Sequence, residues 1–348
     1  MSSAGLGGSD RRRIPTQGQI AAEVGTTTAT VSRVLAKPES HARTELARRV
    51  WSTAKRLDYR PNSVASGLRT RKAQVVGVTL PHMRDEVFGL FYEGIEMGLA
   101  AAGYQAITVT TNDDPATQID KAELLIRRRV DGVLVGDAVE GGAALALLRR
   151  SGMPLVLYNR PARGYTGVTC DDYAGGRMAA DHLIQSTDGP LAVYSGMAHA
   201  RNLALRTQGF LDAAAEAGRA VDPRLVVAGP ILAEAGRIAV STLRELLDGS
   251  RIPGVFLVND MAAISFVGAC EGAGLTAGKD LHVVGFNDIA ISSMVRPALT
   301  TIASPVTDIG RLAAETLVAK IEGRRVGSRS LMPHLVVRSS APGPKRSR

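Results

Sequence analysis

From Gln74 onward, short β-branched segments alternate with longer helical patterns, and this alternation constrains the fold more than any other feature of the sequence. The expected strands are VVGVTL, QAITVTT, VDGVLVG, MPLVLYN, GVTC, PLAVYSG, RLVVAGP, GVFLVN and HVVGFN. Helical stretches such as FGLFYEGIEMGLAAAGY and NLALRTQGFLDAAAEAG lie between them. This order is typical of parallel sheets that are covered by helices on both faces.

There are too many strand and helix units for one comfortable sheet, so we expect two doubly wound halves that meet near residues 171–174. Several helical stretches end in glycine, at Gly103, Gly218 and Gly249, which is the expected left-handed cap. Ligands of open α/β sheets bind beyond the carboxyl ends of the strands. Two facing sheets therefore predict a ligand cleft between the halves, lined by residues that follow strands.

Positive charge is concentrated in the N-terminal part of the chain. The formal net charge of the 348 residues is +9. Between Arg11 and Lys72 there are fourteen lysines and arginines and only four acidic residues, so the remainder is close to neutral. A charged run is usually a solvated face, but so large an asymmetry favours nucleic acid or an anionic membrane surface as a partner of this module.

The N-terminal module has the pattern of a helix-turn-helix. TQGQIAAEV predicts a first helix with Thr16 as its cap, and Gly25 supplies the turn. Thr27 then caps a second helix, in which Thr28 and Ala29 occupy the first turn and Arg33 lies one turn further on the same side. An arginine there can donate two hydrogen bonds to a guanine edge.

The other side chains of this second helix divide into two groups. Thr30 and Ser32 are placed for phosphate contacts, whereas Val31, Val34 and Leu35 face the interior. A threonine-rich amphipathic helix with a solvated arginine would need no DNA, and this window alone leaves that alternative open.

A third helix and a connecting segment follow. The segment ELARRVWSTAKRLDY predicts the helix, with a core stripe of Leu46, Val50, Ala54 and Leu57. After Pro61, Asn62 can cap a short helix in which Leu68 belongs to an apolar face beside Arg69. An apolar wedge with basic flanks suits insertion into the minor groove, and a plain linker is the alternative.

The sequence resembles the LacI/GalR family of bacterial transcription regulators over nearly its whole length. The resemblance rests on IAAEVGTTTATVSRVLA, LDYRPNSVASGLRTRK, VDGVLV, CDDYAGGRMAADHL, LRTQGF, FLVNDMAA, VVGFND and PALTTIASP, in this order and spacing. It implies an N-terminal all-α helix-turn-helix headpiece, a hinge helix that orders on operator DNA, and an α/β core similar to periplasmic sugar-binding proteins. It also implies a homodimer that reads double-stranded, pseudo-palindromic operator DNA.

The boundaries that the resemblance implies divide the chain into five parts. They are a basic tail at 1–13, the helix-turn-helix domain at 14–60, the hinge at 61–73, the effector-binding and dimerisation core at 74–340 and a tail at 341–348. Within the core, the N-subdomain takes about 74–172 and 304–331, and the C-subdomain takes about 173–303 and 332–340.

The resemblance also assigns functional residues by position. The DNA-binding residues are Thr27, Thr28, Ala29, Thr30, Ser32, Arg33, Asn62, Leu68 and Arg69. The effector-binding residues are Phe88, Asn159, Arg160, Arg206, Asn259, Asn287 and Ser304. Asn287 and Ser304 depart from the Asp and Gln of many sugar-responsive members, and Ile231 and Leu232 stand where an aromatic residue commonly stacks on a sugar. Arg206 is a ligand contact or, alternatively, a structural ion-pair partner.

No catalytic or cofactor motif is found in the sequence. G-x-S-x-G, Walker A and H-E-x-x-H are absent, and His182 is interpreted as a helix-face residue. The pairs Asp113–Asp114 and Asp171–Asp172 are explained by helix capping, and Cys170 and Cys270 as small buried residues.

We therefore expect no enzyme, no metal site and no cofactor, but a transcription regulator, a repressor, controlled by a small-molecule effector such as a sugar or related metabolite. The N-terminal sequence lacks a signal-peptide pattern and no apolar run is long enough to span a bilayer, so we expect a cytoplasmic, nucleoid-associated protein. A periplasmic-type binding protein and an α/β enzyme are the competing interpretations.

Overall fold

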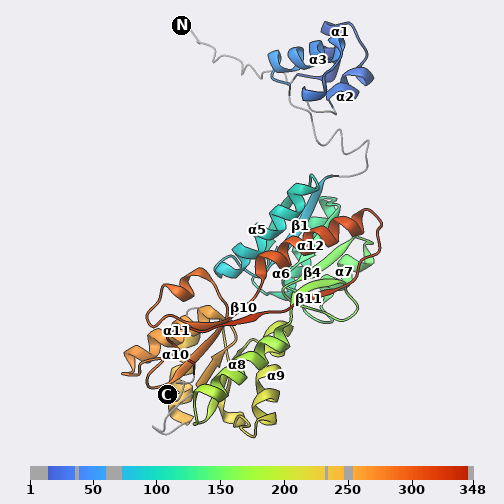
Figure 1. The fold of residues 1–348 in the computed structure, drawn as a ribbon. Coiled ribbons are helices and arrows are strands. Elements are labelled where there is room, and N and C mark those ends of the chain that lie inside the picture. The colour runs from blue at the N-terminus through green and yellow to red at the C-terminus, as the bar shows by residue number, and fades with distance from the viewer. Residues whose placement is uncertain (1–14, 36–38, 60–72, 232–233, 247–253, 344–348) are drawn as a thin grey trace, which may run out of the picture. The chain divides into compact units, whose positions relative to one another are not determined.

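The computed structural model describes residues 15–35, 39–59, 73–231, 234–246 and 254–343. The chain forms two compact units, Met1–Ala73 and Gln74–Arg348 (Figure 1). The described part of the first unit is helical. Its elements are α1 (Gln17–Val24), α2 (Thr28–Leu35), the 3-10 turn η1 (Glu39–His41) and α3 (Glu45–Arg56).

Local sequence signals fix the ends of the first helix. The hydroxyl of Thr16 accepts a hydrogen bond from the backbone N–H of Gln19, and the Gln19 side chain accepts one from the backbone N–H of Thr16. This reciprocal pair is a capping box. Gly25 ends the helix with φ 72°, a left-handed conformation that glycine adopts without steric cost. The sequence therefore predicted both ends correctly.

The three helices share a small apolar core. Its buried members are Ile20, Ala21, Val24, Val31, Leu35, Val50 and Ala54. The expected placement of Leu46 in this core is wrong, because its side chain is 38% exposed and Ala47 is buried instead. The buried arc of α3 runs through Ala47, Val50 and Ala54, which leaves Leu46 on its solvent side.

The second unit contains two six-stranded sheets. The first sheet has the order β11-β5-β4-β3-β1-β2 and the second β12-β10-β9-β8-β6-β7. Every pairing is parallel except that of β12 with β10. The headpiece and the two doubly wound subdomains expected from the sequence are therefore confirmed. The strands of the first sheet are β1 (Val75–Leu80), β2 (Gln105–Thr110), β3 (Gly132–Val135), β4 (Leu155–Tyr158), β5 (Gly167–Cys170) and β11 (Arg329–Leu331).

The strands of the second sheet are β6 (Leu191–Gly196), β7 (Val226–Ala228), β8 (Gly254–Leu257), β9 (His282–Asn287), β10 (Thr300–Ala303) and β12 (His334–Val336). The helices are α5 (Glu86–Ala101), α6 (Pro115–Arg127), α7 (Ala143–Arg150), α8 (Asp172–Ser186), α9 (Arg201–Glu216), α10 (Ala235–Leu246), α11 (Asp260–Gly272) and α12 (Val306–Ile321), with 3-10 turns η2 (Pro223–Leu225) and η3 (Ala290–Ser293). Helices α5 and α12 pack together in one subdomain and α8 and α9 in the other (Figure 1).

The chain crosses three times between the sheets. It passes from β5 to β6, returns from β10 to β11, and crosses again from β11 to β12. One cluster of buried side chains includes residues of both subdomains, such as Val78 of β1 and Phe256 of β8. The crossings bring the carboxyl ends of both sheets to the same region, which is where the fold predicts a ligand site.

Candidate functional site

Thr27 starts the helix that carries the expected DNA-reading residues. Its hydroxyl lies 3.2 Å from the backbone nitrogen of Thr30, which donates to it, and 3.0 Å from the Thr30 hydroxyl. The hydrogen bond satisfies one of the amides that have no partner within α2. This explains how a run of threonines opens a helix despite its poor propensity.

The exposed face of α2 contains Thr28, Ala29 and Arg33. Val31 and Leu35 are buried on the opposite face, and Thr30 and Ser32 are half-buried at the sides. Among the described residues, no carboxylate forms an ion pair with Arg33. Helix α2 therefore packs against the first unit by one face. Its opposite face exposes two small side chains, Thr28 and Ala29, and the long cationic side chain of Arg33. Asn62, Leu68 and Arg69 lie outside the described residues.

A hollow of about 350 Å³ lies between the two subdomains. Its lining residues are Asp85, Val87, Phe88, Asn159, Arg160, Asn202, Leu203, Arg206, Ile231, Asn259 and Asn287. Six of the seven residues expected from the sequence for the effector are therefore brought together. Asp85, Val87, Asn202 and Leu203 were missed, although Asp85 follows a strand and begins a helix, a position that could have identified it.

Ser304 is the exception, because it does not line this hollow. Its side chain is buried next to the Cys170 thiol, and the residue is absent from the lining of the hollow. Ser304 follows β10 where the chain turns into α12, and its carbonyl accepts a hydrogen bond from Val306. The crossover between sheets therefore places it behind the cleft.

Arg160 is buried in the wall of the cleft and paired with a carboxylate. Two of its nitrogens lie 2.6 and 2.7 Å from the two carboxylate oxygens of Asp113. Its Nε atom is buried and has no hydrogen-bond partner within the described part of the chain. Asp114 caps α6 as expected, whereas Asp113 does not cap the helix and pairs with Arg160. One donor of Arg160 thus remains for a ligand.

Arg206 forms a second buried pair. Its Nε donates to Asp172 at 2.8 Å, a terminal nitrogen donates to the carbonyl of Val258 at 2.7 Å, and the guanidinium lies 3.6 Å from the ring centre of Phe286. Burial raises the pKa of Asp172 to about 6, and the arginine opposes that rise. Asp171 caps α8, as expected, whereas Asp172 does not. The structure therefore gives Arg206 an ion-pair role in addition to its place in the cleft wall.

Two asparagines link the subdomains across the cleft. Asn202 donates to the side-chain oxygen of Asn159 at 3.0 Å. Asn259 caps α11, and its amide nitrogen donates to the carbonyl of Ile231 at 3.1 Å and lies 3.4 Å from Asp85. Burial raises the pKa of Asp85, whose carboxylate also caps α5. Asn259 is thereby oriented by backbone groups as well as by a side chain, whereas Asn202 bonds to a side chain.

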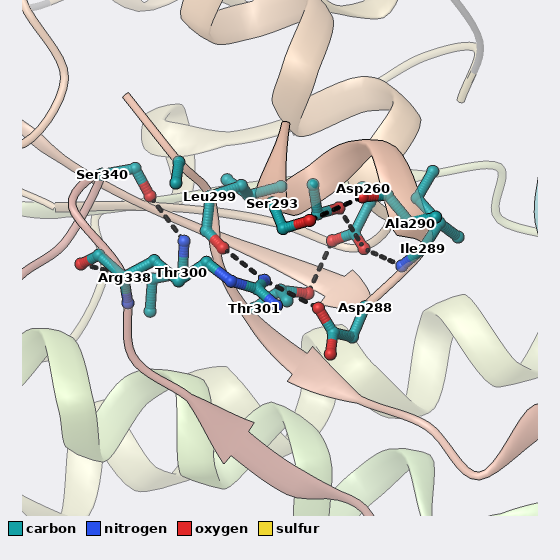
Figure 2. A network of polar contacts seen from close by, with 12 residues as sticks. Asp260, Asp288, Ile289, Ala290, Ser293, Leu299, Thr300, Thr301, Arg338 and Ser340 are labelled. Atoms are coloured by element: carbon teal, nitrogen blue, oxygen red, sulfur yellow. Dashed lines mark hydrogen bonds and ion pairs between the residues drawn. The ribbon is translucent and has the colours of Figure 1, made fainter. Parts of the chain in front are cut away.

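A buried polar network is centred on Asp260, the residue that directly follows Asn259 (Figure 2). Asp260 accepts hydrogen bonds from the Thr301 hydroxyl at 2.6 Å, from the Ser292 hydroxyl at 2.9 Å and from the backbone N–H of Ile289 at 3.0 Å. Asn287 and Asp288 both have positive φ, 119° and 58°. The network therefore holds a backbone turn that asparagine and aspartate tolerate better than most residues.

Other candidate chemistries find little support in the described part of the chain. Cys170 and Cys270 are buried, and His182 is also buried, with Nε2 2.8 Å from the carbonyl of Ala341. No group of metal-binding side chains occurs among the described residues. Within the same residues, none of the helices has the length and apolarity needed to cross a membrane.

Comparisons with known proteins agree with this architecture. Residues 18–62 match the bacterial regulatory proteins of the lacI family, and residues 180–341 match the periplasmic binding protein-like domain. The HTH-type transcriptional repressor PurR of Haemophilus influenzae is 30% identical over 330 residues, which cover 92% of this chain and 97% of that protein. PurR of Aliivibrio fischeri is 28% identical over 318 residues, covering 90% and 94%.

Solved structures show the same likeness. The transcriptional regulator CelR in complex with cellobiose has a TM-score of 0.71 and 25% identity, and the match covers 94% of this chain and 99% of that one. The lac repressor dimer bound to operator and the anti-inducer ONPF has a TM-score of 0.85 at 22% identity, covering 95% and 100%, which is a likeness of fold. With its helix-turn-helix and its two-sheet core, the chain belongs to the lacI family of bacterial regulatory proteins.

Proposed function

We propose that this protein is a sequence-specific DNA-binding transcription regulator, a repressor, whose operator affinity is controlled by a small molecule in the cleft. The observation that carries the proposal is α2, a helix capped by Thr27 that buries one face and presents Thr28, Ala29 and Arg33 on the other. A recognition helix reads base edges through residues of its N-terminal half. Arg33 is its longest side chain and the one able to form a bidentate contact with guanine.

The charges around the cleft favour an uncharged effector that bears hydroxyl groups. Arg160 and Arg206 are each neutralised by a carboxylate, partly buried in Asp113 and fully buried in Asp172, so the cleft offers no surplus cation to an anionic ligand. Buried atoms without partners among the described residues include a donor, Arg160 Nε, and an acceptor, Asn202 Oδ1. A hydroxyl group both donates and accepts and so suits both atoms. Cellobiose in the related CelR is an effector of this class.

Contacts across the cleft give the effector a means of control. Asn202 with Asn159 and Arg201 with Glu140 join the two subdomains at 3.0 and 2.9 Å. A molecule that inserts among these contacts changes the relative orientation of the subdomains. Such coupling between two ligands is typically about 1–3 kcal/mol and is reciprocal.

The regulator acts as a homodimer on a pseudo-palindromic operator in the cytoplasm, associated with the nucleoid. Large apolar side chains are exposed on the core for a second copy to cover: Met83, Met97, Ile107, Ile291 and Met294. Isolated exposed apolar residues are ordinary, and it is a contiguous apolar patch that marks a protein interface, so the proposal requires these residues to meet a second copy together. A dimer would place two copies of α2 on two half-sites.

The experiment that tests the proposal replaces Arg33 by alanine in the full-length chain. Duplexes are selected from a random library with the wild-type protein, and affinities for the selected and scrambled duplexes are then compared. Arg33→Ala should reduce the preference for the selected duplex by about 5- to 150-fold, which corresponds to about 1–3 kcal/mol for one bidentate base contact.

Arg48→Ala is the matched control. Arg48 lies on α3, is exposed, and carries the same charge, with Glu45 as a neighbour at 3.4 Å. Its loss should weaken both duplexes to the same small extent. If Arg33→Ala also weakened both duplexes equally and kept the preference intact, Arg33 would be a phosphate contact and α2 would lose its assigned role.

A further inference from the structure

Three connections of the first sheet carry arginines at the edge where its parallel strands begin. These connections precede β3, β4 and β11. Because strands of a parallel array all begin at one edge, the connections lie along the same edge. We call the exposed arginines they carry the arginine rim, which consists of Arg127, Arg128, Arg129, Arg149, Arg150, Arg324 and Arg325.

The chain coming from the first unit enters the sheet beside this rim. The backbone N–H of Gln74 donates to the carboxylate of Asp131 at 2.7 Å, and the N–H of Asp131 donates to the carbonyl of Val75 at 2.8 Å. Fourteen residues separate Tyr59 from Gln74, a length that spans at most about 50 Å. A duplex held by the first unit is therefore tethered within reach of this edge, which raises its local concentration there.

Arg129 has an unusual backbone conformation for an arginine. Five other helices of the core end with a glycine of positive φ at the equivalent position: Gly103, Gly152, Gly218, Gly274 and Gly323. Helix α6 has Arg129 there, with φ 53°. A left-handed conformation costs free energy for any residue with a Cβ atom, so the chain keeps this arginine against a local preference for glycine.

Few carboxylates neutralise the rim. Glu123 pairs with Arg127 at 3.0 Å, and Glu322 pairs with Arg324 at 2.6 Å. Both pairs are exposed, so water and salt screen them. Among the described residues, no ion pair engages Arg128, Arg150 or Arg325. The corresponding edge of the second sheet is mixed in charge, with Asp188, Lys279 and Asp280 close together.

We propose that the arginine rim binds the phosphate backbone of DNA that flanks the site read by α2, a proposal that rests on the DNA-binding function above. Arginine suits phosphate because its guanidinium donates two parallel hydrogen bonds. Phosphate contacts carry no sequence information but add affinity that depends steeply on salt. The rim thus makes the core a second, sequence-independent DNA surface.

The test measures binding of the full-length chain to a random-sequence 40-base-pair duplex by fluorescence anisotropy at several KCl concentrations. The variant Arg128→Gln/Arg150→Gln/Arg325→Gln removes three exposed charges of the rim. Each lost phosphate contact should reduce the slope of log affinity against log salt by about 0.9. We expect a slope shallower by at least 1 and at least tenfold weaker binding at the lowest salt.

The matched control is Arg224→Gln/Arg237→Gln/Lys279→Gln, which removes three exposed charges from the second subdomain. It should change affinity by less than twofold. Equal effects of the two triple variants would overturn the rim, because net charge alone would then explain them. An unchanged salt slope in the rim variant would also contradict DNA binding by the arginine rim. An acidic protein would then be the partner that these arginines fit.

Arg129→Gly separates a structural role from a binding role. Glycine fits the positive φ of this position, so the thermal midpoint of the core should stay the same or rise while DNA affinity falls. Retained DNA affinity in this variant would count against the rim. A wild-type chain that bound no duplex at all would contradict the proposed function itself, whereas full binding by the rim variants contradicts the rim alone.

Discussion

Asp260 shows how one buried side chain can support several residues of the cleft. It directly follows Asn259, and its hydrogen bonds from Ile289 and Ser292 hold the segment after Asn287, while a third comes from Thr301 of β10 (Figure 2). The Asp260 carboxylate fits at this place because residue 285 is a glycine. A Cβ atom on Gly285 would lie 2.3 Å from the carboxylate. Burial raises the pKa of Asp260 to about 6, and the three donors oppose that rise.

Asp260→Asn should therefore change how stability depends on pH. Between pH about 4 and about 6 the carboxyl is ionised in the unfolded chain and protonated in the folded chain, so its contribution to the free energy of unfolding falls as pH rises. The full change is up to about 3 kcal/mol for a shift of about two pKa units. Urea denaturation from pH 4 to 7 should show a flatter profile in the variant than in the wild type.

Asp181→Asn is the control for this measurement, because Asp181 is exposed on α8 of the same subdomain. Its profile should parallel that of the wild type. If the Asp260 variant also kept the wild-type slope, the carboxyl of Asp260 would titrate in its ordinary range and the burial argument would be wrong.

The identity of the cleft residues was accessible from the sequence, but their partners were not. Arg160 and Arg206 were located by their motifs, yet Asp113 and Asp172 lie 47 and 34 residues from them. Only the fold brings such residues together. Ser304 also follows a strand, and only the fold shows that it does not line the hollow.

At the scale of elements, two glycines allow α8 to pack closely against α9, the helix that carries Arg206. A Cβ atom at Gly176 of α8 would lie 2.0 Å from the carbonyl of Arg206, and one at Gly209 of α9 would lie 2.1 Å from the carbonyl of Tyr173. The backbones of α8 and α9 are therefore in direct contact. This contact places Asp172 and Arg206 within hydrogen-bond distance of each other.

Gly209→Ala should separate α8 from α9 and destabilise the core by about 1–3 kcal/mol, as overpacking commonly does. Urea denaturation measures the loss. Gly268→Ala is the control, because Gly268 lies within α11 and a methyl group added there would meet no atom within 4 Å. This control should stabilise the protein by about 0.5–1 kcal/mol. Equal stability changes in the two variants would show that close helix packing is not what Gly209 provides.

Helices and the first nine strands were predictable because they alternate regularly along the chain, whereas three strands near the C-terminus were not predicted. Strands β10, β11 and β12 have four, three and three residues. The equally short β5 and β7 each precede a helix in the alternating pattern, but β11 and β12 follow each other with no helix between them. They exist because each pairs with a distant strand, as Arg329 of β11 does with Val168 of β5.

At the scale of the whole molecule, three crossings connect the two subdomains that share the cleft. The contacts across the cleft include polar pairs, among them Asn202 with Asn159 and Arg201 with Glu140. Polar contacts of this kind exchange readily with water or ligand groups. The cleft is therefore the place where a small molecule can change the orientation of the subdomains at low cost.

The most direct test measures the DNA affinity of the full-length protein with and without fractions of the low-molecular-mass extract of its source cells. We expect one fraction to shift that affinity by about 5- to 150-fold, the usual range for coupled sites. Asn202→Ala should abolish the shift, because it removes a cleft contact between subdomains, while Gln208→Ala on the exposed face of the same helix should keep it. No shift with any fraction, or an equal shift in Asn202→Ala, would contradict control of DNA binding through the cleft.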